Sequence, residues 1–161
     1  QLKKTRFLQD RNPGVPGIIY KLSQESENVR HLTHARLLWK CASEIFDKPV
    51  HDIYSGKQID ICQRDLDHFI PWSFIKDDNL WNLVLACPTC NRKKNDKLPT
   101  GNYLIALENR NQKIKLETHR SEMKNYQDRM VSYVYHWAKV NGYDKIWQPE
   151  GRKELGEYDR K

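Results

Sequence analysis

The feature that most constrains the fold is a strand, loop, strand, helix order in the middle of the chain. Residues 66–70 and 81–86 are short runs rich in apolar and β-branched side chains, which are typical of strands. Residues 71–79 between them are predicted to form a long loop, which carries the polar run Asp77-Asp78-Asn79. Because proline suits the first turn of a helix, we expect a helix to begin at Pro88. A hairpin followed at once by a helix brings both strand ends close to the helix start.

Helices are expected on both sides of this segment. Between residues 31 and 46 the apolar residues recur at spacings of three and four, which predicts an amphipathic helix. A second apolar stripe, in the last third, has steps of three, four, four and three, as in a helix with one buried face. It consists of Met123, Tyr126, Met130, Val134 and Trp137. Asn141-Gly142 is the predicted end of that helix, since glycine favours the left-handed conformation that closes helices.

Together these elements predict an α+β fold. We expect an irregular segment and helix over residues 1–50, a core over residues 51–98, and a helical region over residues 99–161. The mean hydropathy is low, at −0.89. Five Trp, eight Tyr and four Phe still supply enough bulky apolar side chains for a compact core.

The sequence also excludes several classes of protein. No run approaches the roughly 18 consecutive apolar residues of a membrane helix, and no N-terminal stretch has the form of a signal peptide. The chain begins with Gln1 rather than Met, which suggests an excised domain or a trimmed chain. Without a secretory signal, the CxxC pair of Cys87 and Cys90 indicates reduced thiols or metal ligands. We therefore expect a cytoplasmic protein and exclude a transmembrane, collagenous or disulfide-stapled one.

The charge of the chain points to a polyanionic partner. Lys and Arg number 28 against 21 Asp and Glu, which gives a net charge of +7. The excess is concentrated in residues 1–22 and 92–129. Clustered positive charge attracts polyanions by long-range steering and counterion release. Nucleic acid is the commonest such partner, and a merely solvated basic face is the alternative.

Four polar side chains of the middle segment are expected to converge where the strands meet the helix. They are Asp67, His68, Asn82 and Asn91. Carboxylate and amide oxygens suit Mg²⁺ or Mn²⁺, histidine can take a proton from water near neutral pH, and a helix start favours phosphate. These are the parts needed to hydrolyse a phosphodiester. Taken singly, each residue also has an ordinary explanation as a turn, cap or loop hydrogen bond.

The residues that flank these four complete a motif. Asp67-His68-Phe69-Ile70-Pro71 is followed by Trp81-Asn82-Leu83 and then by Cys87-x-x-Cys90-Asn91-x-x-Lys94. His68 and Asn82 are 14 positions apart, and Asn82 and Asn91 are nine apart. This pattern, within residues 51–98, resembles the HNH endonuclease motif in its His-Asn-Asn variant. The resemblance implies a small ββα-metal core with N-terminal and C-terminal helices packed around it.

The resemblance also implies a role for each motif residue. His68 is expected to be the general base that activates water, in a one-metal mechanism that leaves 5′-phosphate and 3′-hydroxyl ends. Asp67 and Asn91 are the expected ligands of one Mg²⁺ or Mn²⁺ ion, with Asp65 as a rival ligand on the same strand face. Asn82 is expected to hold the loop that carries His68.

A basic run follows the motif directly. It contains Arg92, Lys93, Lys94 and Lys97. Because the run begins at the expected phosphate site, we predict that these four residues bind DNA, although such runs are often only solvated faces.

Structural zinc is a separate question. Many HNH proteins bind it with two CxxC pairs, but here Asp52 and Ser55 stand where the first pair is expected. Zinc on Cys87 and Cys90 is therefore not expected, and buried free cysteines are the favoured interpretation. Three other residues could complete a set of four ligands without any spacing that demands it: Cys41, Cys62 and His51.

Three hypotheses about function follow. The first is a metal-dependent HNH endonuclease that cuts DNA. The resemblance suggests bacterial restriction or antiviral defence for it, or a place as the nuclease domain of a larger protein or RNA-guided complex, with double-strand cleavage requiring a second subunit. The alternative is a non-catalytic DNA-binding module that retains the fold, although such a module has no need of a base and metal ligands. A zinc-ribbon-like interaction domain is a third hypothesis, which stoichiometric zinc would support.

Overall fold

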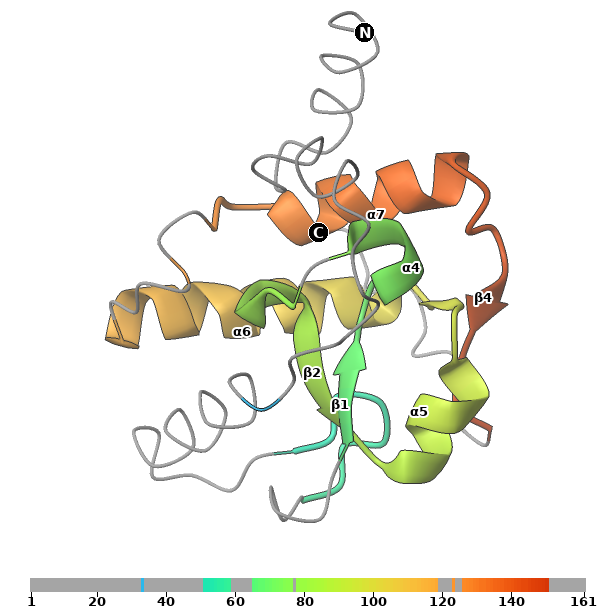
Figure 1. Cartoon of the computed structure of the whole chain (residues 1–161). Coiled ribbons are helices and arrows are strands. Elements are labelled where there is room, and N and C mark those ends of the chain that lie inside the picture. Colours follow the sequence, from blue (N-terminus) through green and yellow to red (C-terminus); the bar gives the residue numbers. More distant parts are fainter. Residues whose placement is uncertain are drawn as a thin grey trace, which may run out of the picture.

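The computed structural model describes residue 33 and residues 51–58, 65–76, 78–118, 123 and 126–150. Within these ranges the chain is an α+β fold, as predicted, with two two-stranded sheets and several helices (Figure 1). The elements are β1 Asp65–His68, α4 Trp72–Ile75, the 3-10 turn η2 Leu80–Asn82, β2 Leu83–Ala86, α5 Pro88–Lys94, β3 Leu98–Pro99, α6 Asn102–Thr118, α7 Met130–Val140 and β4 Ile146–Trp147. The helix predicted over residues 31–46 lies outside the described residues, apart from Thr33, which is helical.

The two predicted strands form an antiparallel hairpin. β1 pairs with β2 in a register that sets His68 opposite Leu83. All four residues of β2 are buried, which explains the continuous apolar run there. Both strands are shorter than predicted, because β1 ends at His68 and η2 takes up the start of the second run.

The segment between the strands is more ordered than the predicted long loop. It contains the short helix α4, which ends where Lys76 adopts a left-handed conformation with a φ of 54°. The Lys76 amide then donates to the Trp72 carbonyl at 2.7 Å. Composition alone does not reveal this helix, because one turn of four residues shows no periodicity.

Helix α5 begins at Pro88, as predicted. Cys87 caps it, with its Sγ accepting from the Cys90 amide at 3.0 Å. The helix ends at Lys94, and Asn95 after it has a φ of 47° and a ψ of −129°.

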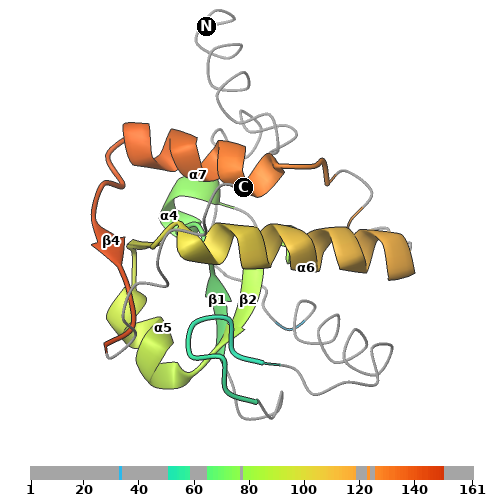
Figure 2. The same ribbon diagram turned by 180° about the vertical axis from the view of Figure 1, so that it is seen from behind.

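The C-terminal region supplies two helices that support the hairpin. α6 crosses the hairpin from behind in Figure 1 and in front of it in Figure 2, and α7 packs against α6. The predicted stripe is not one continuous helix, because Arg129 has a φ of 61° and α7 begins only at Met130. Met123 and Tyr126 precede the helix but are each only 1% exposed, so they still belong to the core. Gly142, with a φ of 100°, follows the end of α7 as predicted.

A parallel pair of short strands closes the fold beside α5. β3 pairs with β4, which places Trp147 opposite Pro99.

Among the described residues, no helix is long and apolar enough to cross a membrane.

Candidate active site

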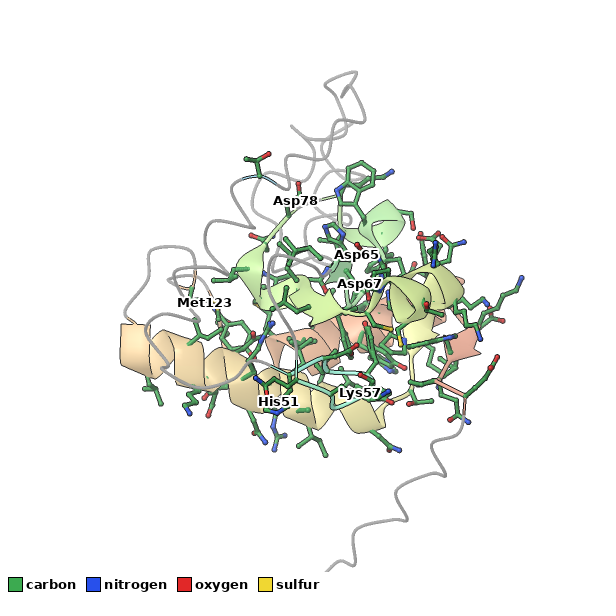
Figure 3. All side chains as sticks on the ribbon, turned by 90° about the horizontal axis from the view of Figure 1, so that it is seen from below. His51, Lys57, Asp65, Asp67, Asp78 and Met123 are labelled. Atoms are coloured by element: carbon green, nitrogen blue, oxygen red, sulfur yellow. The ribbon has the colours of Figure 1, made fainter. Side chains whose placement is uncertain are left out.

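His68 lies at the end of β1, with only 5% of its surface exposed. Its Nε2 is 2.7 Å from the Oδ1 of Asp78. Asp78 lies ten positions further along the chain, in the segment that leads from α4 to η2, and its side chain is 23% exposed (Figure 3). The imidazole is therefore held by a carboxylate near the surface.

Asn82 ties together the two chain segments that meet beside His68. It has no exposed surface. Its Oδ1 accepts from the Ile70 amide and its Nδ2 donates to the Ile70 carbonyl, both at 2.9 Å. The Asn82 carbonyl also accepts from the Phe69 amide at 2.8 Å. These bonds fix the direction in which the chain leaves His68.

Replacing Asn82 with alanine is expected to lower the free energy of unfolding by about 2–3 kcal/mol, since the buried Ile70 amide and carbonyl both lose their partner. Urea denaturation measures this change. Asn109→Ala, at an exposed position of α6, is the control and should stay within about 0.5 kcal/mol of the unsubstituted protein. An equally small change for Asn82→Ala would show that water or a rearranged backbone replaces these bonds.

Helix α6 supports the same turn from behind. The guanidinium of Arg110 donates to the carbonyls of Leu83 at 2.5 Å and Trp81 at 3.2 Å. The Nδ2 of Asn111 donates to the Trp81 carbonyl at 2.8 Å. Residues far along the chain therefore satisfy the carbonyls of the turn that contains Asn82.

Asp67 is the centre of a buried polar network. Its Oδ2 accepts from the Tyr54 hydroxyl at 2.5 Å, and its Oδ1 accepts from the Lys94 ammonium at 3.1 Å. The Lys94 ammonium also donates to the His68 carbonyl at 2.7 Å. Lys94 thus joins both residues of the Asp-His pair to α5.

Burial sets the charge balance of this network. Loss of solvent raises the pKa of Asp67, and the Lys94 ammonium and the Tyr54 hydroxyl oppose that rise. Loss of solvent lowers the pKa of Lys94, against the attraction of Asp67. Burial, together with the nearby Asp67 carboxylate, raises the pKa of Tyr54 well above its ordinary value, so its hydroxyl keeps its proton and donates. Each group depends on the others because none is solvated.

The position of Lys94 corrects one prediction. We expected its side chain to contact DNA phosphates, but it has no exposed surface. Its ammonium contacts Asp67 and the His68 backbone instead, because Lys94 lies on the face of α5 that packs against β1. Lys94 is therefore part of the core.

Asn91 lies one turn before Lys94 and faces the same strand. Its Nδ2 donates to the Oδ2 of Asp65 at 3.0 Å. Figure 3 shows Asp65 and Asp67 next to each other beside α5, as expected for alternate residues of one strand. The structure thus brings Asn91 directly against Asp65, with Asp67 bonded to Lys94 on the same face.

The side chains of Asp65, Asp67 and Asn91 offer oxygen ligands of the kind that suits a hard divalent cation. Two carboxylates and one amide oxygen are the ligand types that Mg²⁺ and Mn²⁺ prefer. A carboxylate offers about four lone-pair positions, so the oxygens of Asp67 that accept from Tyr54 and Lys94 retain capacity for a metal.

The other three basic residues of the predicted DNA contact lie nearer the surface. Arg92 and Lys93 are exposed, and Lys97 is half-buried. The Lys93 ammonium lies 2.9 Å from a carboxylate oxygen of Glu150, an exposed ion pair that stabilises the fold little.

A second polar cluster lies at the start of α5, on the side of the 51–58 loop. One ligand atom each from Asp52, Cys87 and Cys90 lies within 4.8 Å of the others. The cluster lines a cleft of about 490 Å³. Both Asp52 oxygens are already used, because Oδ1 accepts from the Tyr54 and Ser55 amides and Oδ2 from the Cys87 amide at 2.8 Å.

This cluster fits a closed structural zinc site poorly. Such a site takes four ligands, and within the described ranges the cluster has three members. Burial, with the neighbouring Cys87, raises the pKa of Cys90 to about 12 when no metal is bound. Cys41 and Cys62 lie outside the described residues, and His51 is exposed.

Replacing Asp52 with alanine is expected to destabilise the fold by about 2–3 kcal/mol, because three backbone amides lose a charged acceptor. Urea denaturation with and without EDTA tests the cause. If hydrogen bonds alone join the loop to α5, EDTA should leave the unsubstituted protein unchanged. A loss of stability in EDTA that matches the Asp52→Ala loss would instead show that a metal holds the cluster.

Comparison with known proteins confirms the family resemblance. Residues 52–100 match the model of the family described as HNH endonuclease, as the motif predicted.

Two proteins described as CRISPR-associated endonuclease Cas9 are similar to the same part of the chain. The protein from Streptococcus mutans is 44% identical over 52 residues, and the protein from Listeria innocua is 43% identical over 51 residues. Each match covers 30% of this chain but only 4% of the relative. The chain therefore corresponds to a small part of these relatives.

Four residues of the site were not predicted to act there: Asp52, Tyr54, Asp78 and Arg110. Asp52 was noted only where a cysteine was expected, and Asp78 only as part of a polar loop. The sequence signal for Asp78 was that it is an acidic residue in the segment that leads back to Asn82. Tyr54 and Arg110 carried no local signal, since their partners lie 13 and 27 positions away.

Proposed function

We propose that this chain is a metal-dependent endonuclease that hydrolyses DNA phosphodiester bonds. The observation that carries the proposal is the buried Asp67-His68 pair at the end of β1, held by Asn82 within the segment that matches the HNH endonuclease family. A module that only binds DNA would have no use for a histidine whose ring is aligned by a carboxylate.

In the proposed mechanism His68 takes a proton from the attacking water, which is the usual task of a histidine near neutral pH. Asn82 keeps the chain beyond His68 in place through Ile70. Asp67 and Asn91 would hold one Mg²⁺ or Mn²⁺ ion, with Asp65, which bonds to Asn91, as a rival ligand. When bound, the cation would supply positive charge that stabilises the anionic transition state. The expected products carry 5′-phosphate and 3′-hydroxyl ends.

DNA would approach the last turn of α5 and the residues that follow it. Arg92 and Lys93 are exposed in that turn and Lys97, after the helix, is half-buried, and together with the net charge of +7 they favour a polyanion. A single such core cuts one strand, so double-strand cleavage would need a second active site. Because the similar proteins are described as CRISPR-associated endonucleases, we also propose that the chain serves bacterial antiviral defence in the cytoplasm, within a larger assembly.

Cleavage of supercoiled plasmid tests the proposal. The protein is incubated with plasmid in Mg²⁺, in Mn²⁺, or in EDTA, and nicked and linear products are separated on a gel. We expect nicking with either metal and none in EDTA. Salt-sensitive DNA binding without cleavage in any metal would contradict the proposal and favour the binding module.

A further inference from the structure

The contact between His68 and Asp78 determines which ring nitrogen carries the proton. Nε2 of His68 lies 2.7 Å from Oδ1 of Asp78. An ionised carboxylate only accepts hydrogen bonds, so the imidazole nitrogen must be the donor. In a neutral imidazole only one nitrogen carries a proton, and the other holds the lone pair. This distance therefore specifies one tautomer of His68.

The local backbone holds Asp78 in place for this contact. α4 ends at Lys76 in a left-handed conformation, which turns the chain back toward the hairpin. Asn79 is the N-cap residue of η2, and its carbonyl accepts from the Asn82 amide at 3.0 Å. Asp78 thus stands directly before a turn whose last residue, Asn82, is bonded to Ile70. The same turn that fixes the backbone beyond His68 also sets the carboxylate against its ring.

We propose that Asp78 is a positioning residue for His68: its carboxylate accepts the Nε2 proton, so that the lone pair which takes a proton from water lies on Nδ1. This inference rests on the proposed function for its catalytic consequence, but the tautomer itself does not. The role is separate from metal binding, because Asp78 bonds to the ring of His68 while Asp65 and Asp67 face α5. Asp78 also acts without touching substrate.

Two measurements test the inference in the full chain. The first is the ¹⁵N and ¹H NMR spectrum of the His68 ring, without metal, at a pH about two units above the ordinary histidine pKa of about 6.5. The second is the steady-state rate of plasmid nicking in Mg²⁺. Both are made for the unsubstituted protein, Asp78→Ala and Asp78→Asn, with Asp144→Asn as a control that removes the same charge at an exposed site. Circular dichroism checks that each variant folds.

In the unsubstituted protein we expect the proton on Nε2 and the lone pair on Nδ1. Asp78→Ala should give a mixture of tautomers and lower kcat by about 10–100-fold, the range for partners that orient a functional histidine, with KM for plasmid unchanged. Asp78→Asn keeps the shape of the side chain, but its amide can donate as well as accept, so it should also weaken the preference for this tautomer and lower kcat. Asp144→Asn should stay within about twofold of the unsubstituted protein, as expected of a distant surface site.

The two hypotheses fail in different ways. If the unsubstituted protein nicks plasmid while Asp78→Ala does so at the same rate, the positioning role is overturned and the nuclease stands. If the unsubstituted protein does not nick plasmid, the proposed function fails, and the NMR spectra alone decide the contact. A His68 proton on Nδ1, or on both nitrogens, overturns the inference in either case. Should Asp78→Ala fail to fold, the Asp78→Asn rate and spectrum decide.

Discussion

His68→Ala is expected to slow plasmid nicking by about 10²–10⁴-fold, because the variant lacks the group that takes a proton from water. Binding to DNA should change little, since His68 is only 5% exposed and offers almost no surface to the polyanion. The nicking rate in Mg²⁺ and a gel-shift assay in EDTA measure the two effects separately. A large loss in rate without a loss in binding would identify His68 as a catalytic residue.

Two variants control for structural damage from this substitution. His136→Ala removes an exposed histidine on α7, and should leave the rate within about twofold, as is usual for surface positions. His68→Gln fills more of the buried space than alanine does, and it should still be as slow as alanine because an amide is no base. A His68→Gln variant as active as the unsubstituted protein would place the general base elsewhere in the molecule.

The hairpin and the helix after it were predictable because their signals are local. The apolar run before Ala86 and Pro88 at the start of α5 each depend on neighbours within a few positions. The resemblance to the motif implied that Asn82 holds the loop that carries His68, and in the structure Asn82 bonds to Ile70, two positions after His68. Such predictions hold in the folded structure because a strand, a helix start or a tight loop is largely determined by the residues that form it.

Lys94 and Arg129 show where local signals end. A run of basic residues resembles a solvated face, but a helix turns by 100° per residue, so one side chain of the run must face β1. Lys94, three positions after Asn91, is that side chain. The start of α7 was predicted too early, because the apolar residues keep a helical spacing as far back as Tyr126. The left-handed backbone of Arg129 interrupts the helix after Tyr126. In both cases tertiary packing overrides the pattern.

Lys94→Met should be the most destabilising single substitution in the site, at about 3–5 kcal/mol, which is the usual cost of removing one partner of a buried ion pair. The side chain is wholly buried, and methionine replaces its volume but not its charge. Asp67 would keep the Tyr54 hydroxyl as a donor but lose the ammonium. Urea denaturation measures the loss. Lys93→Met, at the exposed neighbouring position, is the matched control and should stay within about 0.5 kcal/mol.

The pH dependence of this variant separates lost charge pairing from lost packing. Burial already raises the pKa of Asp67, and removing Lys94 takes away the main opposing influence. A carboxyl whose pKa is higher folded than unfolded binds more protons when folded, so its ionisation costs stability as the pH rises through the folded pKa. Lys94→Met should therefore regain stability relative to the unsubstituted protein as the pH falls from 8 toward about 5, above the ordinary aspartate pKa of about 3.9.

The double variant Lys94→Met, Asp67→Asn completes the test of this ion pair. Asparagine removes the charge that the single variant leaves buried without its partner, so the double variant should be more stable than Lys94→Met alone at neutral pH. Its stability should also lose the extra pH dependence of Lys94→Met, because the titrating carboxyl is gone. If the double variant were instead no more stable than Lys94→Met, and the single variant showed no added pH dependence, Lys94 would stabilise the fold by packing and by its bond to the His68 carbonyl rather than by pairing with Asp67.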